Sequence, residues 1–198
     1  MKPNIELFWP VSADRDLRAQ IHRILYAVVE QGGAVGYLEP PAPEVTDAWL
    51  DGLFDAVQAG DAAMVLALVD GQVEGTGLWL RGPAPIFAHT AEVGKIMAHP
   101  SARGLGLGRL VVSALIEHAR EAGIETLKLG ARGNNHGAIE LYQQLGFREW
   151  GRLPNVVAIG NMRFDDVKMF MTLNRDPGVV LHGSQEGGPG SSPRRVTV

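Results

Sequence analysis

The sequence predicts a single domain of the α/β (α+β) class over residues 1–174. Apolar residues recur at helical spacing in some segments and gather in short runs, typical of strands, in others. These segments follow one another in the order β-α-α-β-β-β-α-β-α-β-β, which favours one mixed α/β domain. The 198 residues are enough for one domain with a buried core, and no internal repeat is visible.

The first part of the chain predicts one strand and two helices. Residues 4–11 form a short apolar run typical of a strand, and Ser12 is placed to cap the helix that follows over residues 13–31. The second helix begins at Glu44 or Thr46 and ends at Gly60.

Three strands follow, over residues 62–70, 72–80 and 90–98. The pair Asp70-Gly71 is a hairpin turn signal between the first two of them. The clearest helix of the chain follows a glycine-rich segment and covers residues 107–123, because its apolar residues keep the spacing of one helical face.

The last elements of the domain are short. We predict a strand over residues 125–131, a helix over 135–146 and two strands over 147–153 and 167–173. Residues 175–198 are rich in glycine and proline and have no apolar period, so they are predicted to form a disordered tail.

The composition excludes several classes of protein. The chain has no cysteine, which excludes disulfides, thiolate metal sites and a cysteine nucleophile. A net charge of -4 argues against a nucleic-acid-coating surface. No apolar run is long enough for a membrane span, and the N-terminus lacks the apolar core of a signal peptide. We therefore expect a cytoplasmic protein without nucleic-acid or membrane partners.

A glycine-rich loop precedes the helix over residues 107–123. The N-terminus of a helix offers unpaired N–H groups and a partial positive charge, and glycines let a bulky anion approach them closely. The loop therefore favours a pyrophosphate site, although a glycine-rich turn without a ligand fits the glycines as well. The residues concerned are Arg103, Gly104, Leu105, Gly106, Leu107, Gly108 and Arg109.

Two common nucleotide motifs do not fit this loop. A P-loop needs Lys and Ser or Thr after its last glycine, whereas Arg109 and Leu110 follow Gly108. The dinucleotide motif needs G-x-G-x-x-G, whereas the glycines here fall as G-x-G-x-G, and only Glu125 is available as an acidic partner for a ribose.

The loop and a second segment resemble the two signatures of the GCN5-related N-acetyltransferase (GNAT) family. The first signature is Arg103-x-x-Gly106-x-Gly108, preceded by Met97-Ala98-His99-Pro100. The second is Asn135-x-x-Ala138-x-x-Leu141-Tyr142-x-x-Leu145-Gly146-Phe147. Residues 32–37, 48–53 and 91–110 are also similar to the tabtoxin-resistance acetyltransferase type, which inactivates an antimetabolite by acetylating its amine.

The resemblance implies a fold and a cosubstrate. The fold is a mixed central sheet with a splayed parallel strand pair, flanked by helices. The cosubstrate is acetyl-CoA, whose pantetheine arm would pair with the backbone of Met97 and Ala98. Asn135 resembles the residue that binds the same arm, or it is only the N-cap of its helix.

The resemblance also implies catalytic roles. Tyr142 matches the general acid that protonates the departing sulfur, since the pKa of a phenol, about 10, exceeds that of a thiol; alternatively its ring only packs. Glu92 could relay the amine proton through water, or it is a solvated carboxylate at a strand end. The tabtoxin-resistance type has an aspartate where this chain has Gly130, so a contact to the substrate amine is absent, replaced, or supplied by Glu92 alone.

Substrate choice is expected to depend on three loops, over residues 33–39, 82–90 and 154–163. Within them, Tyr37 and Asn155 are candidates to face the acceptor. No metal site is expected, because the histidines show no ligand spacing.

The sequence thus predicts an N-acetyltransferase that acts by direct attack of a small-molecule primary amine, such as an antibiotic or toxin. Two alternatives stay open: a peptide or protein N-acetyltransferase, and a non-catalytic acyl-CoA-binding sensor. The expected partner is the small-molecule amine, and a homodimer is possible.

Overall fold

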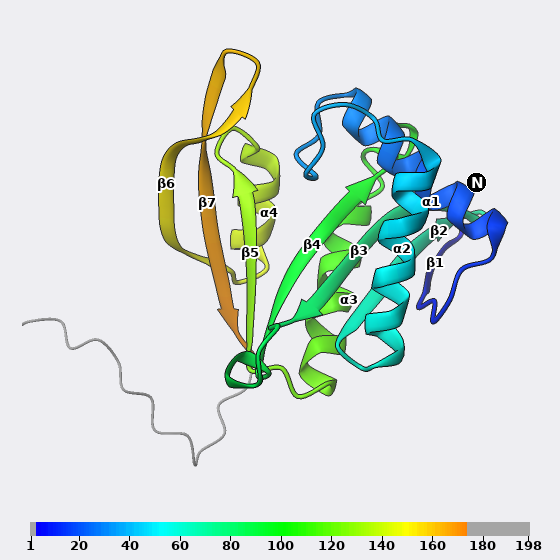
Figure 1. The fold of residues 1–198 in the computed structure, drawn as a ribbon, viewed down its shortest axis with the longest axis horizontal. Helices are drawn as coiled ribbons and strands as arrows, with labels where there is room; N and C mark the ends of the chain where they lie inside the picture. The colour runs from blue at the N-terminus through cyan, green and yellow to red at the C-terminus, as the bar shows by residue number, and fades with distance from the viewer. Residues whose placement is uncertain (1–2, 174–198) are drawn as a thin grey trace, which may run out of the picture.

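The computed structural model describes residues 3–173, and the tail expected after residue 174 lies outside this range (Figure 1). The strands are β1 (Ile5–Phe8), β2 (Ala62–Val69), β3 (Gln72–Arg81), β4 (Thr90–Ala98), β5 (Thr126–Arg132), β6 (Arg148–Ile159) and β7 (Met162–Thr172). The helices are α1 (Arg15–Glu30), α2 (Pro43–Gln58), α3 (Leu107–Glu121) and α4 (His136–Gln144). The predicted order of elements is confirmed.

One mixed sheet contains all of these strands in the order β1-β2-β3-β4-β5-β7-β6. Its neighbours are antiparallel except for β4 and β5, which are parallel. The β4–β5 ladder joins only Thr90–Glu92 to Thr126–Lys128, and beyond it the two strands diverge into a V (Figure 1). This confirms the splayed parallel pair that the resemblance implied.

A bulge in β4 adds to this divergence. Gly94 pairs with Leu78 and Met97 pairs with Thr76, so two residues of β4 face one residue of β3. Lys95, inside the bulge, has a φ of 50°, and its carbonyl accepts a 2.9 Å hydrogen bond from Thr76 Oγ1. The bulge lies just beyond Glu92, where the β4–β5 ladder ends, and because a bulge bends and twists its strand it carries β4 further from β5.

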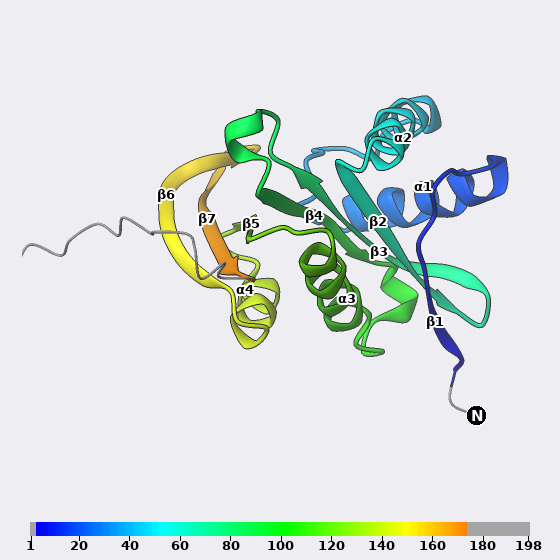
Figure 2. The ribbon, with the colours of Figure 1, turned by 90° about the horizontal axis from the view of Figure 1, so that it is seen from below.

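Helices cover both faces of the sheet. Figure 2 shows α1 and α2 on one face and α3 and α4 on the other. Each pair buries its own cluster of apolar side chains against the sheet, with Ile21 and Leu50 in one cluster and Leu115 and Leu127 in the other. The strands beside the V are therefore held from both sides.

Gly77 of β3 lets α3 pack directly against the sheet. A Cβ added there would lie 2.7 Å from Ile96 Cδ1 and 2.9 Å from Leu115 Cδ1, and nearer still to Val111. We therefore expect Gly77→Ala to lower the free energy of unfolding by about 1–3 kcal/mol, the usual cost of overpacking.

Urea denaturation measures this effect, and Gly52→Ala in α2 is the matched control. A Cβ at Gly52 meets nothing within 4 Å. This control should raise the free energy of unfolding by about 0.5–1 kcal/mol, because alanine is the better helix former. Equal stability of Gly77→Ala and the native chain would contradict the close approach.

Some predicted boundaries were wrong. Asp14, not Ser12, caps α1, and its carboxylate accepts a 2.9 Å hydrogen bond from the N–H of Leu17. The second helix begins at Pro43, and Thr46 is buried inside it, where its hydroxyl lies 2.8 Å from His22 Nδ1.

The largest error concerns residues 154–163, which were expected to form a loop. Most of them extend β6 to Ile159, because Val157–Ile159 pair again with β7 after a bulge. Asp165 and Asp166 accordingly lie within β7. Trp150 is 60% exposed on β6, the edge strand.

Candidate active site

The loop before α3 has the backbone that the phosphate interpretation requires. Gly104 and Gly106 have φ values of 84° and 74°, in the left-handed region that favours glycine. Gly106 is the N-cap of α3, and no side chain caps this helix. The N–H groups of the first turn, which have no intrahelical partners, are therefore not occupied by a cap. A Cβ at either glycine would meet nothing within 4 Å, so the space beside the loop is open.

Two arginines flank this loop. Arg103 Nη2 donates a 2.6 Å hydrogen bond to Gln31 Oε1, and Arg109 bonds the side chain of Gln144 on α4. Neither guanidinium forms an ion pair within residues 3–173, and the first turn of α3 has no acidic residue. The loop is therefore a positively charged site with open N–H donors, which suits a phosphate group.

The other predicted residues of the loop, Leu105, Leu107 and Gly108, differ in burial and in what they contact. Leu105 is partly exposed, whereas Leu107 is buried in the core below α3. A Cβ at Gly108 would lie 3.3 Å from Leu141 Cδ2, so this glycine also lets α4 approach α3.

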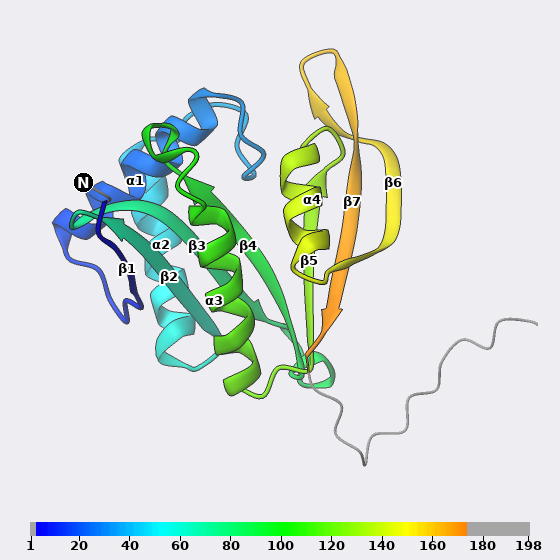
Figure 3. The same cartoon turned by 180° about the vertical axis from the view of Figure 1, so that it is seen from behind.

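The open end of the V brings the other predicted cofactor-binding residues to the same region. Met97 and Ala98 pair with β3 on one edge of β4, while their other edge lies beyond the end of the β4–β5 ladder. Asn135 is the N-cap of α4, and its side chain accepts a 3.4 Å hydrogen bond from Ala138 N–H. Figure 3 shows α3 and α4 on the same face of the sheet, on either side of the V.

Tyr142 lies in α4 and faces the core. It is only 8% exposed, and its ring packs edge-on against Phe147 with centroids 6.0 Å apart. Burial raises the pKa of the Tyr142 hydroxyl to about 12, because removal from water disfavours the phenolate. The hydroxyl therefore stays protonated at neutral pH. The ring of Tyr142 thus packs in the core, and its hydroxyl is in the protonated form that a general acid needs.

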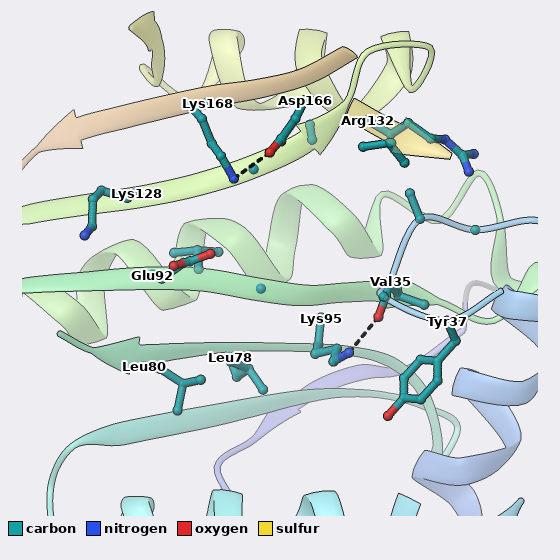
Figure 4. Close-up of a pocket in the computed structure, with 18 of the residues that line it drawn as sticks. Val35, Tyr37, Leu78, Leu80, Glu92, Lys95, Lys128, Arg132, Asp166 and Lys168 are labelled. Atoms are coloured by element: carbon teal, nitrogen blue, oxygen red, sulfur yellow. Dashed lines mark hydrogen bonds and ion pairs between the residues drawn. The ribbon is translucent and has the colours of Figure 1, made fainter. Parts of the chain in front are cut away.

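A pocket of about 870 Å³ opens where β4 and β5 diverge. Glu92 on β4 and Lys128 on β5, which alternate with Ala91, Val93, Leu127 and Leu129 along their strands, are among the residues that line it (Figure 4). Because those four residues are buried in the cluster under α3 and α4, the pocket faces the other side of the sheet. The loop between α1 and α2 and residues 157–159 of β6 also border it.

Two glycines shape the floor of this pocket. A Cβ at Gly94 would meet nothing within 4 Å, which leaves open space above β4. A Cβ at Gly130 would lie 3.0 Å from Lys168 Nζ and 3.4 Å from Asp166 Oδ1. These two side chains form an ion pair with a 2.9 Å separation of Nζ and Oδ2. The ion pair therefore lies over the backbone of Gly130.

The pocket is rich in positive charge, although the whole chain has a net charge of -4. Its acidic side chains are Glu92 and Asp166, and its basic ones are Arg81, Lys95, Lys128, Arg132 and Lys168. Three of the four lysines of the sequence thus gather here. The excess of cations favours a ligand with an anionic group.

Lys95 ties the pocket to the loop between α1 and α2. Its Nζ donates a 2.6 Å hydrogen bond to the carbonyl of Val35 and lies 4.8 Å from the centre of the Tyr37 ring. Burial lowers the pKa of Lys95 because it disfavours the charged amine. Figure 4 shows Lys95, Val35 and Tyr37 at one end of the pocket.

The structure brings some predicted acceptor residues together and not others. Glu92 and Tyr37 line the pocket, whereas Asn155 is not among its lining residues. Asn155 lies in the β6 bulge with a φ of 59°, and its N–H donates a 3.3 Å hydrogen bond to Asp165 Oδ1. Sequence reasoning missed Asp166 and Lys168. Their spacing of two residues in a strand was the one available signal that they share a face.

None of the helices within residues 3–173 has the length and apolar composition that a membrane span requires. In the same range, no group of three or more His, Cys, Asp or Glu side chains is arranged to hold a metal ion.

Comparisons with known proteins agree with this geometry. Residues 33–147 match the model of the acetyltransferase (GNAT) family. Seventy residues are 37% identical to the L-amino acid N-acyltransferase MnaT of Escherichia coli, and cover 35% of this chain and 40% of that protein. An equally long segment, with the same two coverages, is 36% identical to the L-methionine sulfoximine/L-methionine sulfone acetyltransferase of Salmonella typhimurium. The matched segments thus span about two fifths of the length of these relatives.

The likeness to solved structures extends over more of the chain. The structure of the yncA acetyltransferase from Salmonella typhimurium, with its cofactor acetyl-CoA, superposes with a TM-score of 0.75 and 25% identity. This match covers 87% of the present chain and 95% of that one. The divergent parallel strands, the uncapped glycine loop and the family match agree: the chain belongs to the acetyltransferase (GNAT) family.

Proposed function

We propose that this protein is an acetyl-CoA-dependent N-acetyltransferase that acts on the amine of a small amino-acid-like molecule. The observation that carries the proposal is the divergence of β4 from β5. Beyond Glu92 the edge of β4 is not paired with β5; the glycine loop at α3 lies on one face of the sheet there, and the charged pocket lies on the other. We infer that a cofactor bound along this edge reaches an acceptor in the pocket between the two strands.

The residues of the first face fit acetyl-CoA, which supplies an acetyl group activated as a thioester. The open N–H groups after Gly104 and Gly106 would hold the pyrophosphate, with Arg103 and Arg109 beside it. The unpaired edge of β4 at Met97 and Ala98 would bind the pantetheine amides, together with Asn135. The relative with acetyl-CoA bound supports this assignment.

Two side chains are suited to move the protons of the transfer. The attacking amine has to be neutral, and Glu92, in the pocket, would accept its proton directly or through water. Tyr142 Oη keeps its proton at neutral pH and would give it to the leaving thiolate. No nucleophile of the protein is needed, so the proposal is direct attack by the amine, in keeping with a chain without cysteine.

The pocket supports an acceptor that has a carboxylate beside its amine. Its basic side chains outnumber its acidic ones, and two sequence relatives are named for acting on L-amino acids and on methionine sulfoximine. We include antimetabolite amino acids, such as methionine sulfoximine, among the proposed acceptors. The proposed substrates therefore include an antibiotic or toxin with such an amine.

A thiol-release assay tests this function. The protein is incubated with acetyl-CoA and L-amino acids, L-methionine sulfoximine, simple alkylamines and short peptides with free N-termini. We expect CoA release with amino-acid-like amines and an acetylated product in the mass spectrum. Acetyl-CoA binding without CoA release above background for any amine would favour the sensor. Release with the peptides alone would favour the peptide N-acetyltransferase.

The charge of the pocket leads to a further prediction for the acceptor. Replacing the carboxylate of the best L-amino acid by a carboxamide should lower kcat/KM at least about 10-fold, since one charge-assisted hydrogen bond contributes roughly 1.5–3 kcal/mol. Steady-state kinetics with the two compounds measures the ratio. Equal kcat/KM values would contradict an anion-binding pocket.

A homodimer and a cytoplasmic location stay predictions. The exposed side chains of Trp150 and Leu153 on the edge strand β6 support the dimer, because an open strand edge with apolar side chains favours pairing with another chain. Light scattering of the purified protein measures its mass in solution, and a monomer at every concentration would contradict the dimer.

A further inference from the structure

The acceptor pocket lacks a carboxylate at one position where the resemblance implies one. The tabtoxin-resistance type has an aspartate at the place of Gly130, and glycine cannot contact an amine with a side chain. Glu92 would then be the acid left on the β4–β5 floor of the pocket. A second acid nevertheless lines the pocket from the neighbouring strand, and that acid is Asp166.

The register of β5 and β7 brings Asp166 next to Gly130. Gly130 pairs with Lys168, and Arg132 pairs with Asp166, so Asp166 and Lys168 lie on the same face as Gly130. Asp166 Oδ1 lies 3.4 Å from the point where a Cβ of residue 130 would be. The carboxylate therefore occupies the space that a side chain of residue 130 would enter.

We propose that Asp166 binds the acceptor amine in place of an acid at position 130, and that Lys168 positions its carboxylate. This inference rests on the proposed acetyl transfer. Lys168 Nζ holds Asp166 Oδ2 at 2.9 Å, so the carboxylate is held over Gly130. Asp166 Oδ1 forms no hydrogen bond within residues 3–173 and is left to accept one from an amine.

Gly94 leaves room for the amine. A Cβ there would meet nothing within 4 Å, so the floor of the pocket is open above β4, next to the ion pair that covers Gly130. Figure 4 shows Glu92 on β4 and the ion pair on β7 on opposite sides of this opening. An amine there would have Asp166 for binding and Glu92 for proton transfer, so the two acids have different tasks.

Removing the carboxylate of Asp166 and introducing one at position 130, on the paired strand, tests the proposal. Asp166→Asn should lower kcat/KM for L-methionine sulfoximine, or for the best L-amino acid, at least about 10-fold, mainly through the acceptor KM. The KM for acetyl-CoA should not change. Adding Gly130→Asp to Asp166→Asn should restore much of the loss, because the flexible end of Lys168 can yield to the new side chain. Gly130→Asn in the same background should restore nothing.

Asp165→Asn is the matched control. Asp165 is the neighbouring residue of β7, and its carboxylate forms an ion pair with Arg152 at 3.3 Å and does not line the pocket. Its substitution should leave kcat/KM for the acceptor unchanged. An equal loss in Asp165→Asn and Asp166→Asn would show a general effect on the β6–β7 hairpin and would overturn the proposal.

Calorimetric binding of the same amines to the CoA-loaded protein separates this inference from the proposed function. Weaker binding by Asp166→Asn than by the native chain supports the inference, even if no amine is acetylated. Equal binding by the two proteins overturns it, even if acetylation proceeds. If the native chain binds none of the amines, both proposals fail.

Discussion

Replacing Tyr142 by phenylalanine is expected to lower kcat about 10²-fold or more, the usual contribution of a positioned general acid. The ring would still pack against Phe147, so only the proton is lost. Since burial raises the pKa of the hydroxyl to about 12, the native residue is protonated at neutral pH. Steady-state kinetics and calorimetric binding of acetyl-CoA measure the effect, and the affinity should change little.

Tyr26→Phe is the control for this substitution. Tyr26 lies on α1, is 43% exposed, and is not among the residues of the pocket. Its variant should keep the native kcat. A Tyr142→Phe variant with unaltered kcat would exclude the general acid and leave Tyr142 only its place in the core.

Gly106→Val is expected to weaken acetyl-CoA binding at least about 10-fold. A β-branched residue at a φ of 74° costs about 1–3 kcal/mol, and relaxation of the loop would turn the open N–H groups away from the phosphate. Calorimetry gives the dissociation constant, and thermal unfolding gives the change in stability.

Gly60→Val separates loss of binding from loss of stability. Gly60 has a φ of 78°, and a Cβ there would also meet nothing within 4 Å. It lies after α2, away from the glycine loop, so it should lower Tm to a similar extent while keeping the affinity for acetyl-CoA. If Gly106→Val bound acetyl-CoA as tightly as Gly60→Val, the loop would not be the phosphate site.

Local patterns predicted much of this fold. The helices and most strands follow from hydrophobic period, and the loop at Gly106 follows from its glycines before an amphipathic helix. The far end of β6 was missed because Pro154 and a bulge interrupt its pattern. Strand pairing with β7 overrides such local signals.

The acceptor pocket was harder to predict than the glycine loop. The loop is continuous in sequence, whereas the pocket combines residues as distant as Glu92 and Lys168. Their proximity depends on the register of β4, β5 and β7, which no local pattern specifies. The resemblance implied that a carboxylate is missing at Gly130, but the carboxylate beside this residue comes from another strand.

The central claim is that cofactor and acceptor meet through the opening between β4 and β5. The most direct test is the affinity of a bisubstrate analogue, in which CoA is joined through an acetyl linker to the amine of L-methionine sulfoximine. We predict that it binds at least about 10²-fold more tightly than CoA, because one molecule would occupy both faces. Gly106→Val and Asp166→Asn should each weaken it. Affinity no higher than that of CoA alone would contradict the account.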